Sequence, residues 1–263
     1  MLANNNKMII NKLAKNSVKS NKKQYGILFF TIVLSAFMLF CVFTIGWTYL
    51  DSSRLQNTRL NGAEYDITTM NGFTSKQVKS LQSNKNIQNV GMESYAGFIK
   101  SSEFDNTVEI GLLWCDETFW NNLMSPARTK LDGHYPQNKN ELMVTKDILK
   151  TCGNENLSVG DSLILTYENN TGVYTDEFVI SGIWDGYGDT SAGFVSKAFY
   201  DETGYDLKNN GILCIKLNCN YVFPTTIQSI EKSLDFSDRQ IFAPTGYIEN
   251  SFKLLLGICG LAL

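Results

Sequence analysis

The stretch "NKKQYGILFFTIVLSAFMLFCVFTIGWTYLD", from Asn21 to Asp51, decides what kind of protein this chain forms. No residue between Lys23 and Asp51 carries a charge. As an α-helix, residues 26–50 would rise about 37 Å, which is enough to cross the ~30 Å hydrocarbon core of a bilayer. A secretory signal has a shorter apolar region followed by a small-residue cleavage site, and this stretch has neither. We therefore predict a transmembrane helix over residues 25–50, with a buried helix of a soluble protein as the less favoured alternative.

The charges on the two sides of the predicted span are unequal. The first 23 residues contain no acidic residue and carry six lysines: Lys7, Lys12, Lys15, Lys19, Lys22 and Lys23. Of the 23 basic residues in the chain, 17 therefore come later, against all 26 acidic residues. Because lysines beside a span stay on the cytoplasmic side, we predict a cytoplasmic N-terminus and an extracytoplasmic segment 51–250. Tyr25 at the inner end, and Trp47 and Tyr49 at the outer end, suit the membrane interfaces.

Residues 1–24 have a pattern of their own. Ile10, Leu13, Ala14 and Val18 recur at helical spacing, with lysines between them. This pattern predicts a basic amphipathic cytoplasmic segment that lies on the inner leaflet and leads into the span. An unstructured lysine-rich tail is the alternative. We expect anionic lipid of the bilayer, and no nucleic acid, to be the partner of this segment.

Segment 51–250 has the composition of a folded domain. The chain is 12% aromatic and has only 4 prolines, and no low-complexity tract or fixed-period repeat is visible. A domain of about 200 residues is long enough for one sizeable core or for two small lobes that share an interface.

Hydrophobic periodicity predicts an α+β fold for this segment. The clearest element is a β-hairpin over residues 161–185, with two alternating runs around "ENNTG". Asparagine pairs at 121–122, 169–170 and 209–210 predict turns. The other predicted elements are strands in 64–70, 89–102, 106–116, 141–145 and 211–218, and helices or helical turns in 74–87, 116–124, 146–152 and 224–236. We expect a mixed α/β domain with two lobes, in which the first and last portions form one lobe and the β-rich middle forms the other.

The chain closes on the apolar sequence "LLLGICGLAL" after Lys253. Ten helical residues rise roughly 15 Å, about half of a bilayer core. We therefore expect residues 251–263 to be the truncated start of a second transmembrane helix, which would make this sequence a fragment of a multi-pass protein of the cell membrane. The alternative is an apolar helix that docks onto the domain.

Residues that could carry catalysis or bind a metal are few. The chain has a single histidine, His134, which we expect on a surface loop. The sequence "DGYGD" could offer Asp185 and Asp189 to calcium, but it lacks the 12-residue pattern and its terminal Glu, so a glycine-rich turn is favoured. Six cysteines are scattered without a C-x-x-C pair, and we expect free, mostly buried thiols. We predict no catalytic, metal-binding or cofactor-binding residues, and no enzymatic activity.

The order of these segments resembles the FtsX/MacB-type permeases of ABC transporters. The lysine-rich "LAKNSVKSNKKQ" is similar to the lead-in before their first span. In "GHYPQNKNELMVTKDIL", Gly133 and Pro136 precede Glu141 and a short strand, as in the family. "LSVGDSLILTY" resembles the element in which Gly160 and Asp161 turn into a hairpin. "EFVISGIWD", with Phe178, Val179, Gly182 and Ile183, resembles the return strand. The sequence departs from the family at His134, where an arginine is common.

The resemblance implies a permease subunit that transmits motion rather than catalyses a reaction. Its expected partners are a cytosolic ABC ATPase subunit and a possible second copy of the permease. ATP hydrolysis by that partner would move segment 51–250, the MacB-like core domain, to export a peptide, antibiotic or lipid-like substrate or to transmit force. The alternative function is a ligand-sensing domain of a membrane receptor or sensor kinase. A single-pass surface enzyme is the least favoured alternative, because no catalytic constellation was found.

Overall fold

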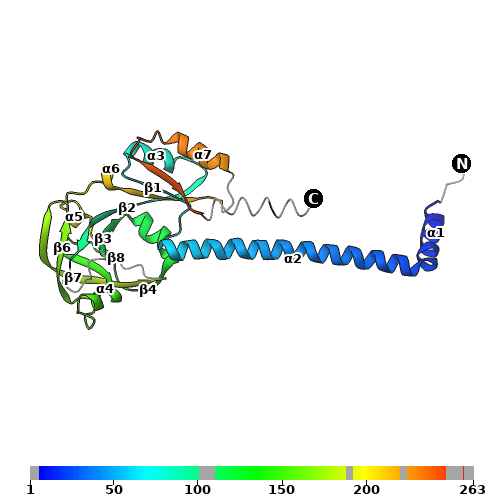
Figure 1. Ribbon diagram of the computed structural model, residues 1–263, viewed down its shortest axis with the longest axis horizontal. Coiled ribbons are helices and arrows are strands. Elements are labelled where there is room, and N and C mark those ends of the chain that lie inside the picture. The colour runs from blue at the N-terminus through cyan, green and yellow to red at the C-terminus, as the bar shows by residue number, and fades with distance from the viewer. Residues whose placement is uncertain (1–5, 101–109, 188–191, 220–223, 247–256, 258–263) are drawn as a thin grey trace. The chain divides into compact units, whose positions relative to one another are not determined.

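The computed structural model describes residues 6–100, 110–187, 192–219, 224–246 and 257 (Figure 1). The chain divides into two compact units, of which the first includes the residues up to Asp51 and the second spans Ser52–Lys253. The predicted second span, residues 251–263, lies outside the described residues except for Gly257.

The described part of the first unit is helical. Helix α1 (Asn6–Ser20) occupies the basic prefix, and helix α2 (Lys22–Asn61) contains the predicted span. The helical conformation predicted for residues 25–50 is thus confirmed, and α2 continues past residue 50 for about three turns. Among the described residues, α2 is the helix that is long and apolar enough to cross a membrane. Most of its apolar side chains from Ile27 to Tyr49 are exposed, as a lipid-facing helix requires.

The second unit is built on a mixed β-sheet. Its described strands are β1 (Ile67–Met70), β2 (Ile87–Ile99), β3 (Ile110–Cys115), β4 (Arg128–Gly133), β5 (Glu141–Thr145), β6 (Ser162–Asn169), β7 (Gly172–Gly186), β8 (Ala192–Val195), β9 (Ile212–Leu217) and β10 (Ile241–Pro244). They form one 10-stranded sheet in the order β10-β1-β9-β2-β3-β8-β5-β7-β4, with β6 paired to β2 and β7. The β3–β8 and β5–β7 pairs are parallel and the others are antiparallel. The predicted α+β class is therefore confirmed.

Short helices connect the strands. They are α3 (Ser75–Gln82), the π-helical turn η1 (Phe119–Leu123), the 3₁₀ turn η2 (Ser125–Ala127), α4 (Lys146–Thr151), α5 (Lys197–Tyr200), α6 (Leu207–Asn210) and α7 (Pro224–Ser233). The predicted threonine cap of α3 is present, since Thr74 and Gln77 form a reciprocal capping box. Helix α7 begins at Pro224, whose fixed φ suits the first helical turn.

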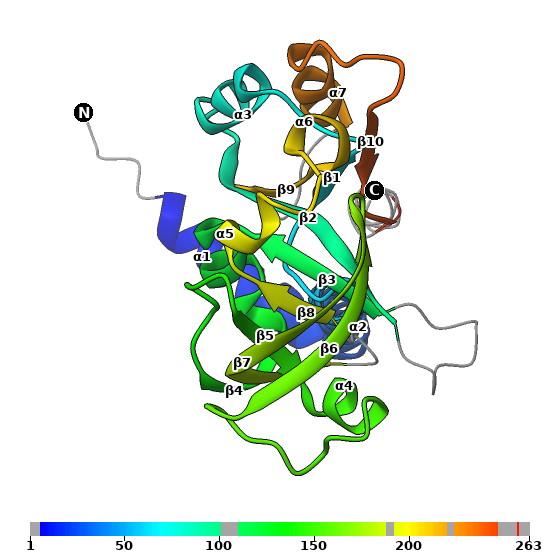
Figure 2. The same cartoon turned by 90° about the vertical axis from the view of Figure 1, so that its left-hand side faces the viewer.

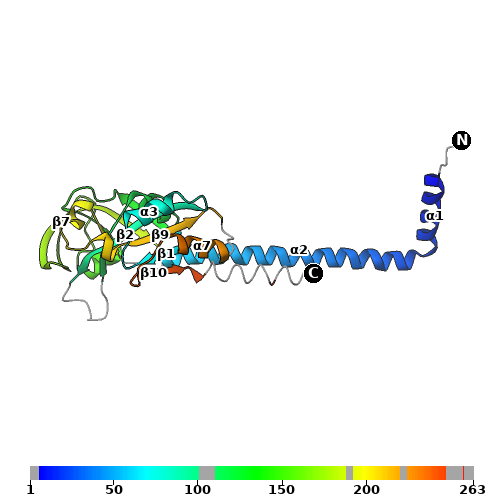
Figure 3. The ribbon, with the colours of Figure 1, turned by 90° about the horizontal axis from the view of Figure 1, so that it is seen from above.

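Three clusters of buried apolar side chains lie on this sheet. One packs α3 and α7 against β1, β9 and the first half of β2. A second is built from the β-rich middle, including α4, α5 and the β6–β7 hairpin. The third surrounds η1 and includes Phe119, Trp184 and Phe194. Figure 2 shows α3, α6 and α7 together near β1 and β9, with α4 at the far end, and Figure 3 shows α7 beside β1 and β10. The first and last portions of the domain therefore pack together as predicted. The long strand β2 passes through the first two clusters, so the two lobes share one continuous sheet.

Local turns follow the predicted chemistry at two places and differ at a third. In the hairpin, the Asn169 side chain accepts hydrogen bonds from the N–H groups of Thr171 and Gly172, at 2.8 and 3.2 Å. Gly160 has a φ of 95°, a left-handed conformation that glycine adopts without strain, and it forms the predicted turn before β6. The helical turn predicted over residues 116–124 is confirmed by η1. The asparagine pair 121–122, which was also expected to mark a turn, lies inside η1, because the apolar residues around it are buried against the sheet.

Candidate functional site

Strand β9 carries a lysine inside the otherwise apolar sequence "ILCIKL". Leu213, Ile215 and Leu217 belong to the core that α3 and α7 cover. Because side chains alternate across a strand, Cys214 and Lys216 face the opposite side of the sheet. Lys216 is only 6% exposed, so its ammonium group requires charged partners in the interior.

Two carboxylates provide those partners. Lys216 Nζ lies 3.1 Å from Asp66 Oδ2 and 3.4 Å from Glu64 Oε1. Glu64 Oε1 also lies 3.7 Å from Nη1 of Arg54, which belongs to α2. The N–H of Leu217 donates to Asp66 Oδ2 at 2.8 Å. We call Arg54, Glu64, Asp66 and Lys216 the junction network, because they connect the last turns of α2 to strands β1 and β9.

Burial governs the electrostatics of the junction network. Asp66 is 2% exposed, and burial raises the pKa of its carboxyl group above the ordinary value, although Lys216 and the Leu217 N–H act to lower it. The network contains two cations and two carboxylates, so its charges balance. Removing Lys216 or Asp66 leaves the other charge buried without its partner, which is far more costly than losing a surface pair.

The chain that leaves α2 is fixed by further contacts. Gly62, with a φ of 69°, follows the helix in the left-handed conformation common at helix C-termini. The N–H of Glu64 donates to the carbonyl of Leu123 in η1 at 2.7 Å. On the helix, Arg59 Cζ lies 4.2 Å from the centre of the Tyr187 ring, a cation–π contact. The end of α2 is thus attached to β1, β9, η1 and the segment after β7.

Glu93 of β2 adds a titratable group on the same side of the sheet. Cys214 Sγ donates to Glu93 Oε1 at 3.9 Å. Burial raises the pKa of Glu93 from 4.5 to about 7, while the contact with the Cys214 thiol lowers it. Burial also raises the pKa of the Cys214 thiol, and the negative charge of Glu93 adds to that rise. Glu93 therefore changes its protonation near neutral pH.

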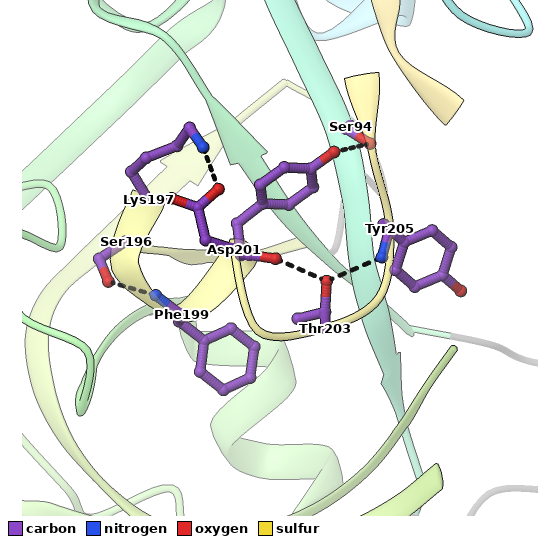
Figure 4. Close-up of polar contacts among 8 residues, drawn as sticks. Ser94, Ser196, Lys197, Phe199, Asp201, Thr203 and Tyr205 are labelled. Atoms are coloured by element: carbon purple, nitrogen blue, oxygen red, sulfur yellow. Dashed lines mark hydrogen bonds and ion pairs between the residues drawn. The ribbon is translucent and has the colours of Figure 1, made fainter. Parts of the chain in front are cut away.

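A second region with polar side chains lies between the segment after β8 and the β6–β7 hairpin. Figure 4 shows how the segment after β8 is held there. Ser196 Oγ accepts from the N–H of Phe199 at 3.2 Å, and Thr203 Oγ1 accepts from the N–H of Tyr205 at 3.4 Å. Lys197 pairs with Asp201 in the same view.

This segment and the β6–β7 hairpin enclose a cavity of about 240 Å³. The charged groups in its wall already have partners. Lys139 Nζ lies 2.5 Å from Glu202 Oε2, and the Tyr167 hydroxyl donates to Asp176 Oδ2 at 2.7 Å. A charged ligand would have to displace these contacts, so we do not assign a binding role to this cavity.

The residues singled out in the sequence do not form a common site. His134 is exposed after β4, as expected, and its Nδ1 lies 3.0 Å from the Tyr135 carbonyl. Asp185 is exposed on β7, whereas Asp189 lies outside the described residues. Of the five described cysteines, Cys115 and Cys214 are buried, Cys41 and Cys152 are partly exposed and Cys219 is exposed, so the prediction of mostly buried thiols is wrong. Within the part of the chain that the structure describes, no group of three His, Cys, Asp or Glu side chains is placed to hold a metal ion.

The junction network was not predicted from the sequence. Its signal was a single lysine in the apolar strand "ILCIKL", which requires an acidic partner if the strand is buried on both faces. Glu64 and Asp66 lie within the predicted strand 64–70 and could have been proposed as those partners. The pairing of β1 with β9, however, joins segments about 150 residues apart, and local periodicity does not predict such a pairing.

Comparison with known proteins gives structural similarity alone. No family model matches the chain, and no curated protein matches it. The fold is similar to the periplasmic region of MacB from Actinobacillus actinomycetemcomitans, with a TM-score of 0.46, 12% identity, and coverage of 74% of this chain and 95% of that structure. It is also similar to the extracellular domain of the noncanonical ABC-type transporter YknZ from Gram-positive bacteria, with a TM-score of 0.44, 11% identity, and coverage of 68% and 98%.

Proposed function

We propose that the chain is part of a permease subunit of an ABC transporter, in which α2 transmits motion from the membrane to the sheet domain. The observation that carries this proposal is the junction network. Arg54 lies on the same 40-residue helix as the apolar stretch, and its partner Glu64 contacts Lys216 of β9. A displacement of α2 would therefore act directly on strands β1 and β9.

The expected topology follows from the charges. The lysine-rich α1 lies on the cytoplasmic side, the apolar part of α2 crosses the bilayer, and the acidic second unit lies outside the cell. A cytosolic ABC ATPase is the partner that supplies energy, and this chain itself is not an enzyme. The cargo is a peptide, an antibiotic or a lipid-like molecule, or the device transmits force without transport.

The first test concerns the partner. A tag on the chain allows the intact complex to be purified from native membranes in mild detergent. We expect an ABC ATPase to co-purify and to hydrolyse ATP, and the tagged chain alone to hydrolyse none. Co-purification with a kinase or another signalling protein, and no ATPase, would favour the sensor alternative instead.

The second test concerns transmission through α2. Ser53→Pro introduces a helix-breaking residue between the apolar stretch and Arg54 and should cost about 3 kcal/mol or more in the helix. We expect this substitution to abolish transport or force transmission in the complex while ATP hydrolysis by the partner persists. Ser53→Ala, which preserves the helix, is the matched control. Unchanged transport in the proline variant would show that a continuous α2 is not needed.

Topology can be tested with membrane-impermeant thiol labels in whole cells. Asp161→Cys places a thiol on the exposed turn before β6, and Lys12→Cys places one on α1. In a background with the native cysteines replaced by serine, we expect the first variant to label and the second to stay unlabelled until the cells are opened. The reverse pattern would overturn the orientation.

A further inference from the structure

A hollow lined by polar and charged residues lies on the α3–α7 side of the sheet. It is a cavity of about 490 Å³ between α3, α6 and the segment that follows α7. Cavities that bind small molecules commonly have volumes of 300–1,000 Å³, so this one is large enough for such a ligand. Most of the residues that line it carry a hydroxyl or amide group, including Thr74, Ser80, Asn209 and Ser237.

The framework of this cavity is fixed by hydrogen bonds between elements distant in sequence. Gln77 Nε2 donates to the carbonyl of Leu234 at 3.0 Å and lies 3.1 Å from Gln240 Oε1. Gln240 Nε2 donates to the carbonyl of Gly72 at 2.7 Å. The side chain of Asn71 donates to the carbonyl of Arg239 at 2.8 Å. These contacts hold the wall in place before any ligand arrives, which limits the ordering cost of binding.

The charges around the cavity are strongly unequal. Three cations, Lys76, Lys208 and Arg239, line it together with one carboxylate, Asp235. Each cation comes from a different element, and all three side chains are exposed. Within the described residues, none of the three forms an ion pair. This excess of positive charge stands out because acidic residues outnumber basic ones after the predicted span.

We propose that this cavity binds a small anion with two or more negative charges and with hydroxyl or carbonyl groups, such as a phosphorylated or carboxylated sugar or peptide. The three cations contact the charged groups, and the neutral polar side chains contact the remainder of the ligand. This inference goes beyond the proposed permease function and rests on a different set of residues. A ligand here would serve equally as cargo, as a regulator or as a sensed molecule.

The test uses the full chain in detergent micelles and two probes, pyrophosphate and citrate, at constant ionic strength. Isothermal titration calorimetry should show saturable binding at one site per chain for at least one probe. The variant Lys76→Gln/Lys208→Gln/Arg239→Gln should weaken that binding at least tenfold. Asp235→Asn removes the one negative charge and keeps a residue that tolerates the φ of 49° found there, so it should tighten binding about threefold.

A matched control separates a specific site from general attraction of anions. Lys79→Gln/Lys85→Gln/Lys232→Gln makes the same change in net charge at exposed lysines of the same region that do not line the cavity. We expect this variant to bind the probes as the parent does. Equal weakening in the two triple variants, or no saturable binding to either probe, would overturn the proposal. Binding only to vesicles with anionic lipids, and not to the free probes, would assign the cations to a membrane surface and would also overturn it. None of these outcomes depends on an ATPase partner.

Discussion

The charged side chains on the two faces of the paired strands β1 and β9 differ in burial and in ion pairing. On one face, Lys216 is buried and paired with Asp66 and Glu64. On the other face, above the apolar layer formed with α3 and α7, three exposed cations surround a cavity with a single carboxylate. A charge that is buried and paired resists change and transmits displacement, whereas exposed cations that form no ion pair among the described residues remain available to a ligand. The same short strands thus support a mechanical connection and a candidate binding cavity.

The largest expected effect on stability comes from removing a buried charge of the junction network. Lys216→Met removes the cation and leaves Asp66 buried beside Glu64, which should lower the free energy of unfolding by about 3–4 kcal/mol. Chemical denaturation of the full chain in detergent, followed by tryptophan fluorescence, measures this change.

A double variant tests whether the uncompensated charge is the cause. Asp66→Asn in the Lys216→Met background removes that charge and keeps an oxygen that can accept from the Leu217 N–H, so it should recover at least half of the loss. A loss in Lys216→Met below about 1 kcal/mol would show that the junction network is not a stabilising set.

The next largest expected effect is a change in the stability of the domain with pH, caused by Glu93. Its pKa is about 7 in the folded domain, mainly because of burial, against an ordinary value of 4.5. The folded state therefore binds more protons than the unfolded state between these values, so the domain should lose stability as pH rises from about 4.5 to 7. The expected loss is roughly 2–3 kcal/mol, since one pKa unit corresponds to about 1.4 kcal/mol.

Glu93→Gln isolates that contribution. The substitution removes the titrating group, so it should flatten the pH dependence of the unfolding midpoint across this interval. Asp185→Asn, at an exposed carboxylate on β7, is the control and should leave the slope intact. A stability that rises with pH in the parent chain would contradict the assignment.

The β-hairpin, the capped helix α3 and the apolar part of α2 could be predicted because each has a clear local pattern. Strand β4 could not, because its sequence "RTKLDG" lies at the sheet edge with little burial and shows no alternation. Strand β8, "AGFV", is too short to show a period. The sequence before β4 was also misleading at 121–122, where asparagines that favour turns are held in η1 by the burial of Phe119 and Leu123.

Neither charge cluster was predicted, for a different reason. The junction network depends on the pairing of β1 with β9, and the cavity depends on contacts of α3 with the segment after α7. Lys76, Lys208 and Arg239 are unremarkable as isolated surface residues. What distinguishes them is that a fold with distant pairings brings them to one cavity.

A substitution at Gly72 tests whether the position of Lys208 is needed for anion binding in the cavity. Its φ is 91°, and a Cβ there would lie 1.9 Å from the carbonyl oxygen of Lys208. Gly72→Ala should therefore destabilise the domain by about 2 kcal/mol and displace the segment that carries Lys208, which should weaken binding of the anion probes. Gly153→Ala is a matched control, because Gly153 has a φ of 68° with no atom within 4 Å of the added Cβ. It should show only the smaller cost of the left-handed conformation, and anion binding should be unchanged.

The smallest effect on stability, and the sharpest distinction between stability and transmission, is expected at Arg54. Its guanidinium lies 3.7 Å from Glu64, and the two side chains are 36% and 26% exposed, so solvent screens the pair. Arg54→Gln should therefore change the free energy of unfolding by less than about 1 kcal/mol, similar to Lys139→Gln at the exposed pair with Glu202. If α2 acts on the sheet through this contact, Arg54→Gln should speed hydrogen exchange at the β1 and β9 amides and reduce transport in the complex, whereas Lys139→Gln should do neither. Equal behaviour of the two variants would leave Lys216 and Asp66 with a role in stability alone and would require another route from the helix to the sheet.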